Sequence, residues 1–303
     1  MYDIEELFEA ESPAHAVELL SQHPAAKIIA GGSDILIAIR EGKLAGCTLV
    51  SIQKIDALRG VSLADDGAIR IGPLTSFSHV ASDPVIQQYI PVLAEAVETI
   101  GGPQLRNIGT IGGNVCNGVT SADSASTLLA YDAVMEYLGP GGTRLVPIAE
   151  HYIGAGKTAL AHNEILQAIL IPRESYGGAF GNYIKYAMRG ALDIATLGCS
   201  ANVRLSRDKA ASPPVIERLR LAYGVAGPIP LRALSAEKAA AGKPATAETI
   251  AAAAAAVADD INPRTSWRAS RDFRLHLAKE LAARAIAESL RRAGVASPAV
   301  TFD

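Results

Sequence analysis

Two glycine pairs, each followed by small polar residues, are the features of this sequence best suited to hold a ligand. The pairs lie in Ala30-Gly31-Gly32-Ser33-Asp34, which continues the apolar run Lys27-Ile28-Ile29, and in Thr110-Ile111-Gly112-Gly113-Asn114. Glycine lets a ligand approach the backbone closely, and successive N–H groups at such turns form a concave anion site. Either pair alone is typical of a tight turn without a ligand. The two together predict a site that holds a diphosphate without a lysine.

Other residues with possible chemical roles are isolated. Asp123 and Asp193 are single carboxylates, and each is suited either to capping a helix or to contacting a ligand. Cys47, Cys116 and Cys199 lie far apart and show no CxxC spacing, which argues against an iron–sulfur cluster or a zinc site in this chain. The six histidines are scattered as well, so we expect no metal site. We name no catalytic acid or base.

Four familiar nucleotide and hydrolase motifs are missing or incomplete. Gly154-Ala155-Gly156-Lys157-Thr158 matches the end of a P-loop, but His151 stands where its first glycine belongs. The dinucleotide fingerprint GxGxxG is absent, and so are GxSxG and HExxH. A P-loop NTPase and a Rossmann dehydrogenase are therefore disfavoured.

The composition describes a globular chain with no signs of membrane or nucleic-acid binding. The 303 residues are 49% hydrophobic and 19% charged, with a net charge of −3, so a sizeable core is expected. No apolar run is long enough for a transmembrane helix, and the acidic start at residues 1–6 argues against a signal peptide. Three dispersed cysteines fit a reducing compartment. We therefore predict a cytoplasmic location and no nucleic-acid or membrane partner.

The elements that would position the glycine pairs can be predicted along the chain. A helix is expected to begin at Ser12-Pro13, with Ser12 as its cap, and strands are expected at 27–30 and 48–52. A hairpin should follow at 61–71, turning at Asp65-Asp66-Gly67. Helices are predicted at 84–99 and 121–131. Further strands are predicted at 133–138, 143–148 and 165–171.

The chain after Pro172 reads as a separate α+β unit. Strands are expected at 183–186 and 218–225, and the last part of the chain should be helical, with a long amphipathic helix at 273–292. The alanine run at 251–256 indicates helix, because alanine is the best helix former.

The two glycine motifs, in this order and spacing, resemble those of the flavin-binding subunits of molybdenum hydroxylases. The resemblance covers the whole chain, and the segment 104–114 is its most specific part. Further anchors are the segments 121–123, 163–166 and 185–189, while 120–125 and 266–270 are most similar to bacterial three-subunit xanthine dehydrogenases. The resemblance implies an α+β fold: a two-subdomain FAD clamp of the vanillyl-alcohol-oxidase type over 1–57 and 58–176, then a C-terminal α+β domain over 177–303.

The resemblance also implies a set of cofactor contacts. Lys27 to Asp34 and Thr110 to Asn114 would wrap the FAD diphosphate through backbone N–H groups, and Asp123 would bind a polar part of FAD at its adenosine end. Ile165 or Leu166 and Lys185 would lie near the rings. Ile100 stands where some relatives have an aromatic residue that stacks on the cofactor. Neither glycine turn contains a histidine or cysteine, so binding should be non-covalent.

The function implied is electron transfer without a hydroxylating site in this chain. Electrons would arrive from a 2Fe–2S partner subunit and leave as a hydride to NAD⁺, with the loop Arg189–Asp193 lining the face that NAD⁺ approaches. The molybdenum cofactor would lie on a large molybdopterin-binding partner in a heterotrimer that oxidises xanthine or hypoxanthine in purine catabolism. Two alternatives remain open, a stand-alone FAD oxidase and a non-enzymatic scaffold.

Overall fold

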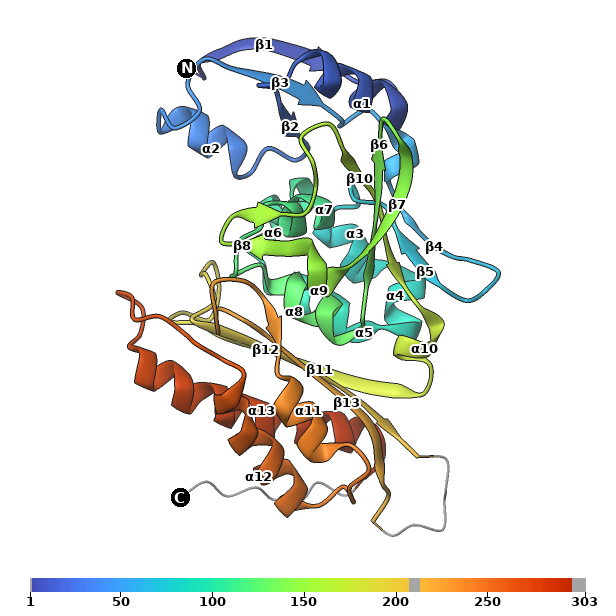
Figure 1. Cartoon of the computed structure of the whole chain (residues 1–303), viewed down its shortest axis with the longest axis vertical. Coiled ribbons are helices and arrows are strands. Elements are labelled where there is room, and N and C mark those ends of the chain that lie inside the picture. Colours follow the sequence, from blue (N-terminus) through green and yellow to red (C-terminus); the bar gives the residue numbers. More distant parts are fainter. Residues whose placement is uncertain (1, 207–212, 296–303) are drawn as a thin grey trace.

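A computed structural model describes residues 2–206 and 213–295, and three sheets follow one another along its long axis (Figure 1). The first sheet is parallel, in the order β1-β3-β2, from β1 (Ile4–Glu9), β2 (Lys27–Ile29) and β3 (Cys47–Ser51). Two helices connect these strands, α1 (Pro13–Gln22) and α2 (Ile35–Arg40). As predicted, the Ser12 hydroxyl caps α1 by accepting from the His15 N–H at 3.1 Å.

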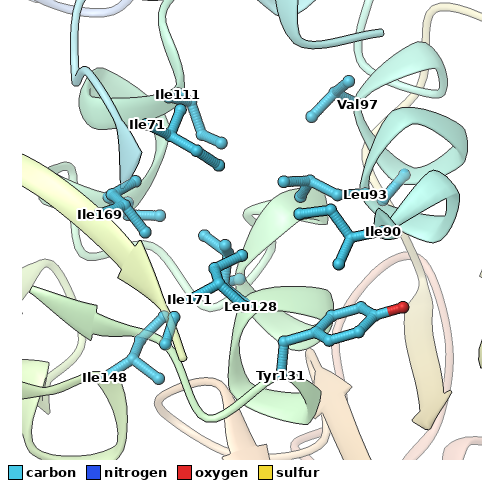
Figure 2. Close-up of a cluster of buried hydrophobic side chains, with 14 of the residues drawn as sticks. Ile71, Ile90, Leu93, Val97, Ile111, Leu128, Tyr131, Ile148, Ile169 and Ile171 are labelled. Carbon is cyan, nitrogen blue, oxygen red and sulfur yellow. The ribbon is translucent and has the colours of Figure 1, made fainter. Parts of the chain in front are cut away.

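The second sheet is antiparallel and lies beside a layer of short helices. Its order is β4-β5-β10-β6-β7. The strands are β4 (Val61–Leu63), β5 (Ile69–Ile71), β6 (Val134–Gly139), β7 (Gly142–Pro147) and β10 (Ile165–Ile171). The helices are α3 (Phe77–Ser82), α4 (Pro84–Tyr89), α5 (Pro91–Glu98), α6 (Pro103–Ile108), α7 (Ile111–Cys116) and α8 (Asp123–Ala130). Figure 2 shows apolar side chains of β5, β10, α5 and α8 converging in the core between sheet and helices.

The third sheet lies between the helices of the second unit and its own helical layer (Figure 1). It runs β11-β12-β13-β14, from β11 (Ala179–Tyr186), β12 (Leu197–Leu205), β13 (Ile216–Gly224) and β14 (Leu231–Arg232). Its own helices are α11 (Leu234–Ala240), α12 (Ala247–Ala256) and α13 (Arg271–Arg292). Short elements complete the fold: η1 (Asp56–Leu58), α9 (Ile148–His151), β8 (Tyr152–Gly154), β9 (Lys157–Thr158), α10 (Arg173–Tyr176) and η2 (Val257–Asp259).

One predicted element was wrong, and some strands, β1 and β12 among them, were not predicted. The single helix expected at 84–99 is two helices, because Pro91 starts α5 and Ile90 before it leaves the helical conformation. Strand β12 was not predicted. Residues 197–203 of this strand are all buried, so it lacks the alternation of buried and exposed side chains that marks a strand in sequence.

The P-loop-like segment forms strands β8 and β9, which pair as a hairpin. No helix follows Lys157 there, so the segment lacks the helix N-terminus that a P-loop uses to bind phosphate. No helix in the described ranges is both long and apolar enough to cross a membrane. In the same ranges, no cluster of three histidine, cysteine or acidic residues is arranged to hold a metal.

Candidate functional site

The first glycine turn presents a row of free backbone donors. It connects β2 to α2, and Gly32 adopts the left-handed conformation with φ +76°. The N–H groups of Gly31, Gly32, Ser33 and Asp34 donate to no acceptor within residues 2–206 and 213–295. Four adjacent unpaired donors need water or a ligand, and an anion satisfies them best.

The two glycine segments meet, as the sequence predicted. A Cβ atom added to Gly31 would lie 2.1 Å from the carbonyl oxygen of Ile108, so only glycine allows this approach. The amide of Asn117 donates to the Asp34 carboxylate at 3.1 Å and ties the same two segments together. Between them lies a cavity of about 230 Å³, and Ala30, Gly31, Asn107, Ile108 and Thr110 are among the residues that line it.

The second glycine turn differs from the prediction, because the N–H groups of Ile111 to Asn114 are already bonded within the protein. Thr110 caps α7, accepting from the Gly113 N–H through its hydroxyl at 3.1 Å and from the Asn114 N–H through its carbonyl at 3.0 Å. Ile111 donates to the carbonyl of Thr75, and Gly112 donates to that of Pro73.

The two glycines of this second pair have different surroundings. A Cβ added to Gly112 would lie 2.4 Å from a Pro73 carbon, so Gly112 serves internal packing. Gly113 is exposed, and a Cβ there would meet only the Thr110 hydroxyl. The second turn therefore offers an open glycine surface and the Thr110 hydroxyl to a ligand, whereas the row of four adjacent free N–H groups belongs to the first turn.

A buried polar cluster joins two other predicted residues, Asp123 and Lys185. The Lys185 ammonium donates to the Asp123 carboxylate at 2.8 Å and to the Thr99 carbonyl at 3.0 Å. The Tyr183 hydroxyl donates to the other Asp123 oxygen at 2.8 Å. Burial raises the pKa of Asp123 above its ordinary value, while Lys185 and Tyr183 oppose that rise. Because Lys185 lies on β11 and Asp123 starts α8, the third sheet completes this cluster.

The second glycine turn is also linked to the polar cluster. The Ser124 hydroxyl donates to the side-chain oxygen of Asn114 at 2.7 Å, which connects α7 to the start of α8. The structure therefore brings the predicted residues of α7, α8 and β11 into one continuous network.

The three apolar residues predicted to contact the cofactor lie in different parts of the structure. Ile100 is 8% exposed and follows Thr99, whose carbonyl accepts from Lys185, so Ile100 lies beside the polar cluster. Ile165 and Leu166 are core residues of β10. Ile165 packs in the hydrophobic core beside the first sheet, and Leu166 packs in the core between the second sheet and its helices. In the described structure neither side chain has a surface exposed beyond 4%.

Sequence reasoning missed Tyr183 and the Thr99 carbonyl. Tyr183 could have been found, since it lies two residues before Lys185 on one strand and alternate residues of a strand share a face. The Thr99 carbonyl gave no signal, because any residue there offers the same group.

The loop 187–195 approaches the segment after Ile100. Leu192 has φ +55°, and its side chain is the nearest neighbour of Gly102. Arg189 pairs with Asp193 at 3.8 Å and is largely exposed. Nearby, the Arg268 guanidinium stacks 4.1 Å above the ring of exposed Trp267 and adds its positive charge to the surroundings of Asp193. This surface is open and positively charged beside the buried cluster.

Comparison with known proteins gives full-length similarities. Residues 3–174 match the FAD binding domain in molybdopterin dehydrogenase, and residues 182–289 match the CO dehydrogenase flavoprotein C-terminal domain. The putative xanthine dehydrogenase FAD-binding subunit of Escherichia coli is 42% identical over 294 residues, covering 97% of this chain and 99% of the relative. The carbon monoxide dehydrogenase medium chain of Hydrogenophaga pseudoflava is 31% identical, covering 91% of this chain and 93% of that one.

A solved structure has the same fold. The carbon monoxide dehydrogenase from Hydrogenophaga pseudoflava that lacks the Mo-pyranopterin moiety superposes with a TM-score of 0.90 at 31% identity, covering 96% of this chain and 99% of that one. The resemblance read from the glycine motifs and the fold class is thereby confirmed. On the strength of both domain matches and these relatives, the chain belongs to the family of FAD-binding medium subunits of molybdenum hydroxylases.

Proposed function

We propose that this chain is the flavin electron relay of a xanthine dehydrogenase-type enzyme. It would take electrons from a 2Fe–2S partner subunit and deliver a hydride to NAD⁺, while a molybdopterin-binding large subunit oxidises xanthine or hypoxanthine. The observation that carries the proposal is the row of free N–H groups from Gly31 to Asp34, closed against Ile108 beside the cavity. We also propose domain limits at residues 57 and 176 and a cytoplasmic heterotrimer.

In this proposal the chain binds FAD through the predicted residues in distinct ways. Lys27 to Asp34 bring the free N–H groups to the diphosphate, and Thr110 to Asn114 close over it with the Gly113 surface and the Thr110 hydroxyl. Asp123 binds a polar part of FAD and is oriented by Lys185, while Lys185, Ile100 and either Ile165 or Leu166 lie near the rings. Drug-sized ligands gain about 0.3 kcal/mol per heavy atom, so roughly 50 atoms allow about 15 kcal/mol without a covalent bond.

The bound FAD would supply the chemistry of collecting single electrons and releasing them in pairs. The residues of this chain hold it in position, keep water from the Asp123–Lys185 cluster, and leave the loop Arg189–Asp193 free to receive the acceptor. Arg189 is 69% exposed, which suits it to contact an anionic dinucleotide.

A stand-alone flavin oxidase is the main alternative. It would need a substrate pocket with its own acid or base beside the cofactor. The Asp123–Lys185 cluster is closed by Tyr183 and Thr99, which favours a relay. A scaffold with empty turns is the second alternative, and the presence of bound flavin separates it from both others.

The first test is an absorption spectrum of the purified full-length chain, followed by heat release of any flavin. A yellow protein that releases intact FAD supports the relay and the non-covalent site. A colourless protein that takes up no added FAD would leave the scaffold as the better reading. Reduction of the assembled enzyme by xanthine, followed by oxidation with NAD⁺, then tests the substrate and the acceptor separately.

The role of the loop is tested by reversing one charge. We expect Arg189→Glu to raise the KM for NAD⁺ at least fivefold while the FAD content stays the same, because Arg189 is exposed and its hydrogen bonds stay within its own loop, to Leu192 and Asp193. Arg284→Glu on α13, where the side chain is 66% exposed, is the matched control and should change neither. If both variants show the same KM for NAD⁺, the loop Arg189–Asp193 does not form part of the acceptor site.

A further inference from the structure

His151 is a fully buried histidine to which the proposed function assigns no role. It ends α9, and both of its ring nitrogens are hydrogen-bonded. Nε2 lies 3.1 Å from the Val115 carbonyl oxygen, and Nδ1 bonds the Tyr137 hydroxyl. A carbonyl only accepts, so Nε2 carries the proton, and Nδ1 of the neutral ring accepts from Tyr137. The ring thus connects β6 to Val115 of α7.

Helix α7 needs such support from outside. It has six residues, two of them glycine, and glycine is a much poorer helix former than alanine. Isolated helices this short are unstable, so tertiary contacts must fix its position. At its start Gly112 donates to the Pro73 carbonyl, and near its end the Val115 carbonyl accepts from both Gly118 and His151. The His151 side chain therefore anchors a backbone carbonyl near the end of α7.

We propose that His151 is a positioning residue that holds α7, and with it Thr110 and Gly113, in place for the cofactor. This inference rests on the proposed FAD site, since α7 carries its second glycine turn. His151 touches no proposed ligand contact itself and acts through the Val115 carbonyl. The two residues are 36 positions apart in the sequence, so the link exists only in the folded chain.

The surroundings of His151 favour the neutral ring. Tyr137 and Tyr152 face it, and the Tyr152 ring packs edge-on at 4.6 Å. Cys116 of α7 lies close to both tyrosines, and burial raises its pKa to about 12, so it stays a thiol. Arg144 stacks on Tyr137 at 4.7 Å but is paired with Glu164. Burial lowers the pKa of His151, so the ring is protonated only in acid. A proton on Nδ1 would then oppose the bond donated by Tyr137.

The test compares two substitutions of His151 by FAD affinity. His151→Leu removes both hydrogen bonds and should raise the Kd for FAD at least tenfold at pH 7.5, well below the unfolding temperature. His151→Gln keeps a side-chain N–H for Val115 and does not titrate. It should recover most of the affinity. The wild-type Kd should rise as the pH falls from 7.5 to 5, and the rise should be smaller in His151→Gln.

Tyr223→Phe is the control for a general loss of stability. It removes another buried bond to a helix carbonyl, from the Tyr223 hydroxyl to Ala278 at 2.8 Å, within the core of the third unit. Its Kd for FAD should equal that of the wild type. If His151→Leu lowers the melting temperature but leaves the Kd unchanged, the positioning role is wrong. If the wild type binds no FAD, the proposed function fails instead, and the two failures are thereby distinguished.

Discussion

Gly31 occupies a position that no side chain can share. The Cβ of an alanine would lie 2.1 Å from the Ile108 carbonyl oxygen, and a backbone atom cannot move aside as a flexible side chain can. We expect Gly31→Ala to separate the two glycine segments, to cost about 1–3 kcal/mol of unfolding free energy, and to weaken FAD binding more than tenfold. Urea unfolding and FAD titration measure the two effects.

Gly141 provides the matched control for this prediction. A Cβ there would meet no atom within 4 Å, and its φ is not in the left-handed region. Gly141→Ala should therefore leave both stability and FAD affinity unchanged. Wild-type affinity in Gly31→Ala would show that the segments need not meet to bind the cofactor.

The Asp123–Lys185 pair should make stability depend on pH once it is broken. Burial raises the pKa of Asp123, and Lys185→Met removes the main opposing charge, so that pKa rises further. Between the unfolded and folded pKa values the native variant then binds more protons than its unfolded chain. Its unfolding free energy therefore falls as pH rises. We expect the unfolding free energy of Lys185→Met to be about 3 kcal/mol below that of the wild type at pH 8, and the difference to be smaller at pH 5.

Urea unfolding at pH 5, 6.5 and 8 measures this dependence. The double variant Asp123→Asn/Lys185→Met has no carboxylate at position 123 to protonate, so its unfolding free energy should lack the fall with rising pH that Lys185→Met shows. If the unfolding free energy of Lys185→Met differs from that of the wild type by the same amount at all three pH values, Lys185 does not stabilise the charged form of Asp123.

Helix α7 links local stability to cofactor binding at the scale of one element. Thr110 caps it through the bond from the Gly113 N–H, and loss of such a cap costs about 1 kcal/mol. Thr110→Val should show that loss together with an FAD Kd raised at least fivefold, and Thr110→Ser should restore both. Thr246 caps α12 in the same way, by accepting from the Thr249 N–H. Thr246→Val should lose similar stability without any change in FAD affinity.

An ion-pair network joins the second and third units at the scale of the whole molecule. Asp132, after α8, accepts from Arg232 at 2.5 Å and from Arg220 at 2.9 Å, and both arginines also pair with buried Glu237. Arg232→Met would leave Glu237 with the hydrogen bond from the Leu221 N–H at 3.1 Å and the longer ion pair with Arg220 at 3.6 Å. We expect Arg232→Met to lose about 2 kcal/mol of unfolding free energy. This is less than the cost of breaking a fully buried ion pair, because Asp132 is 30% exposed.

The contacts between the second and third sheets should also determine the order in which FAD release and unfolding occur. Lys185 brings the third sheet to Asp123, so separation of the units should release FAD before the sheets themselves unfold. In Arg232→Met, flavin release should precede the loss of circular dichroism in a urea titration. Coincident transitions, as in a two-state protein, would show that the network does not control the coupling.

Local chemistry in the sequence determined much of this protein. The cap at Ser12, the turn between β4 and β5, the long helix α13 and both glycine segments follow from residue preferences that act within a few positions. The motif spacing was specific enough to indicate the family, which the full-length relatives confirm. The break between α4 and α5 at Pro91, although it was not predicted, also follows from local chemistry, because proline has no backbone N–H to donate within a helix.

Only the tertiary structure decided how the glycine turns are used. Both turns contain a glycine pair followed by a small polar residue, yet Gly31 to Asp34 keep free N–H groups whereas those of Ile111 to Asn114 are bonded to Pro73, Thr75 and Thr110. Asp123 and Lys185 are 62 positions apart, and His151 and Val115 are 36 apart. Such partners are chosen by how sheets and helices pack, and no preference that acts over a few residues specifies them.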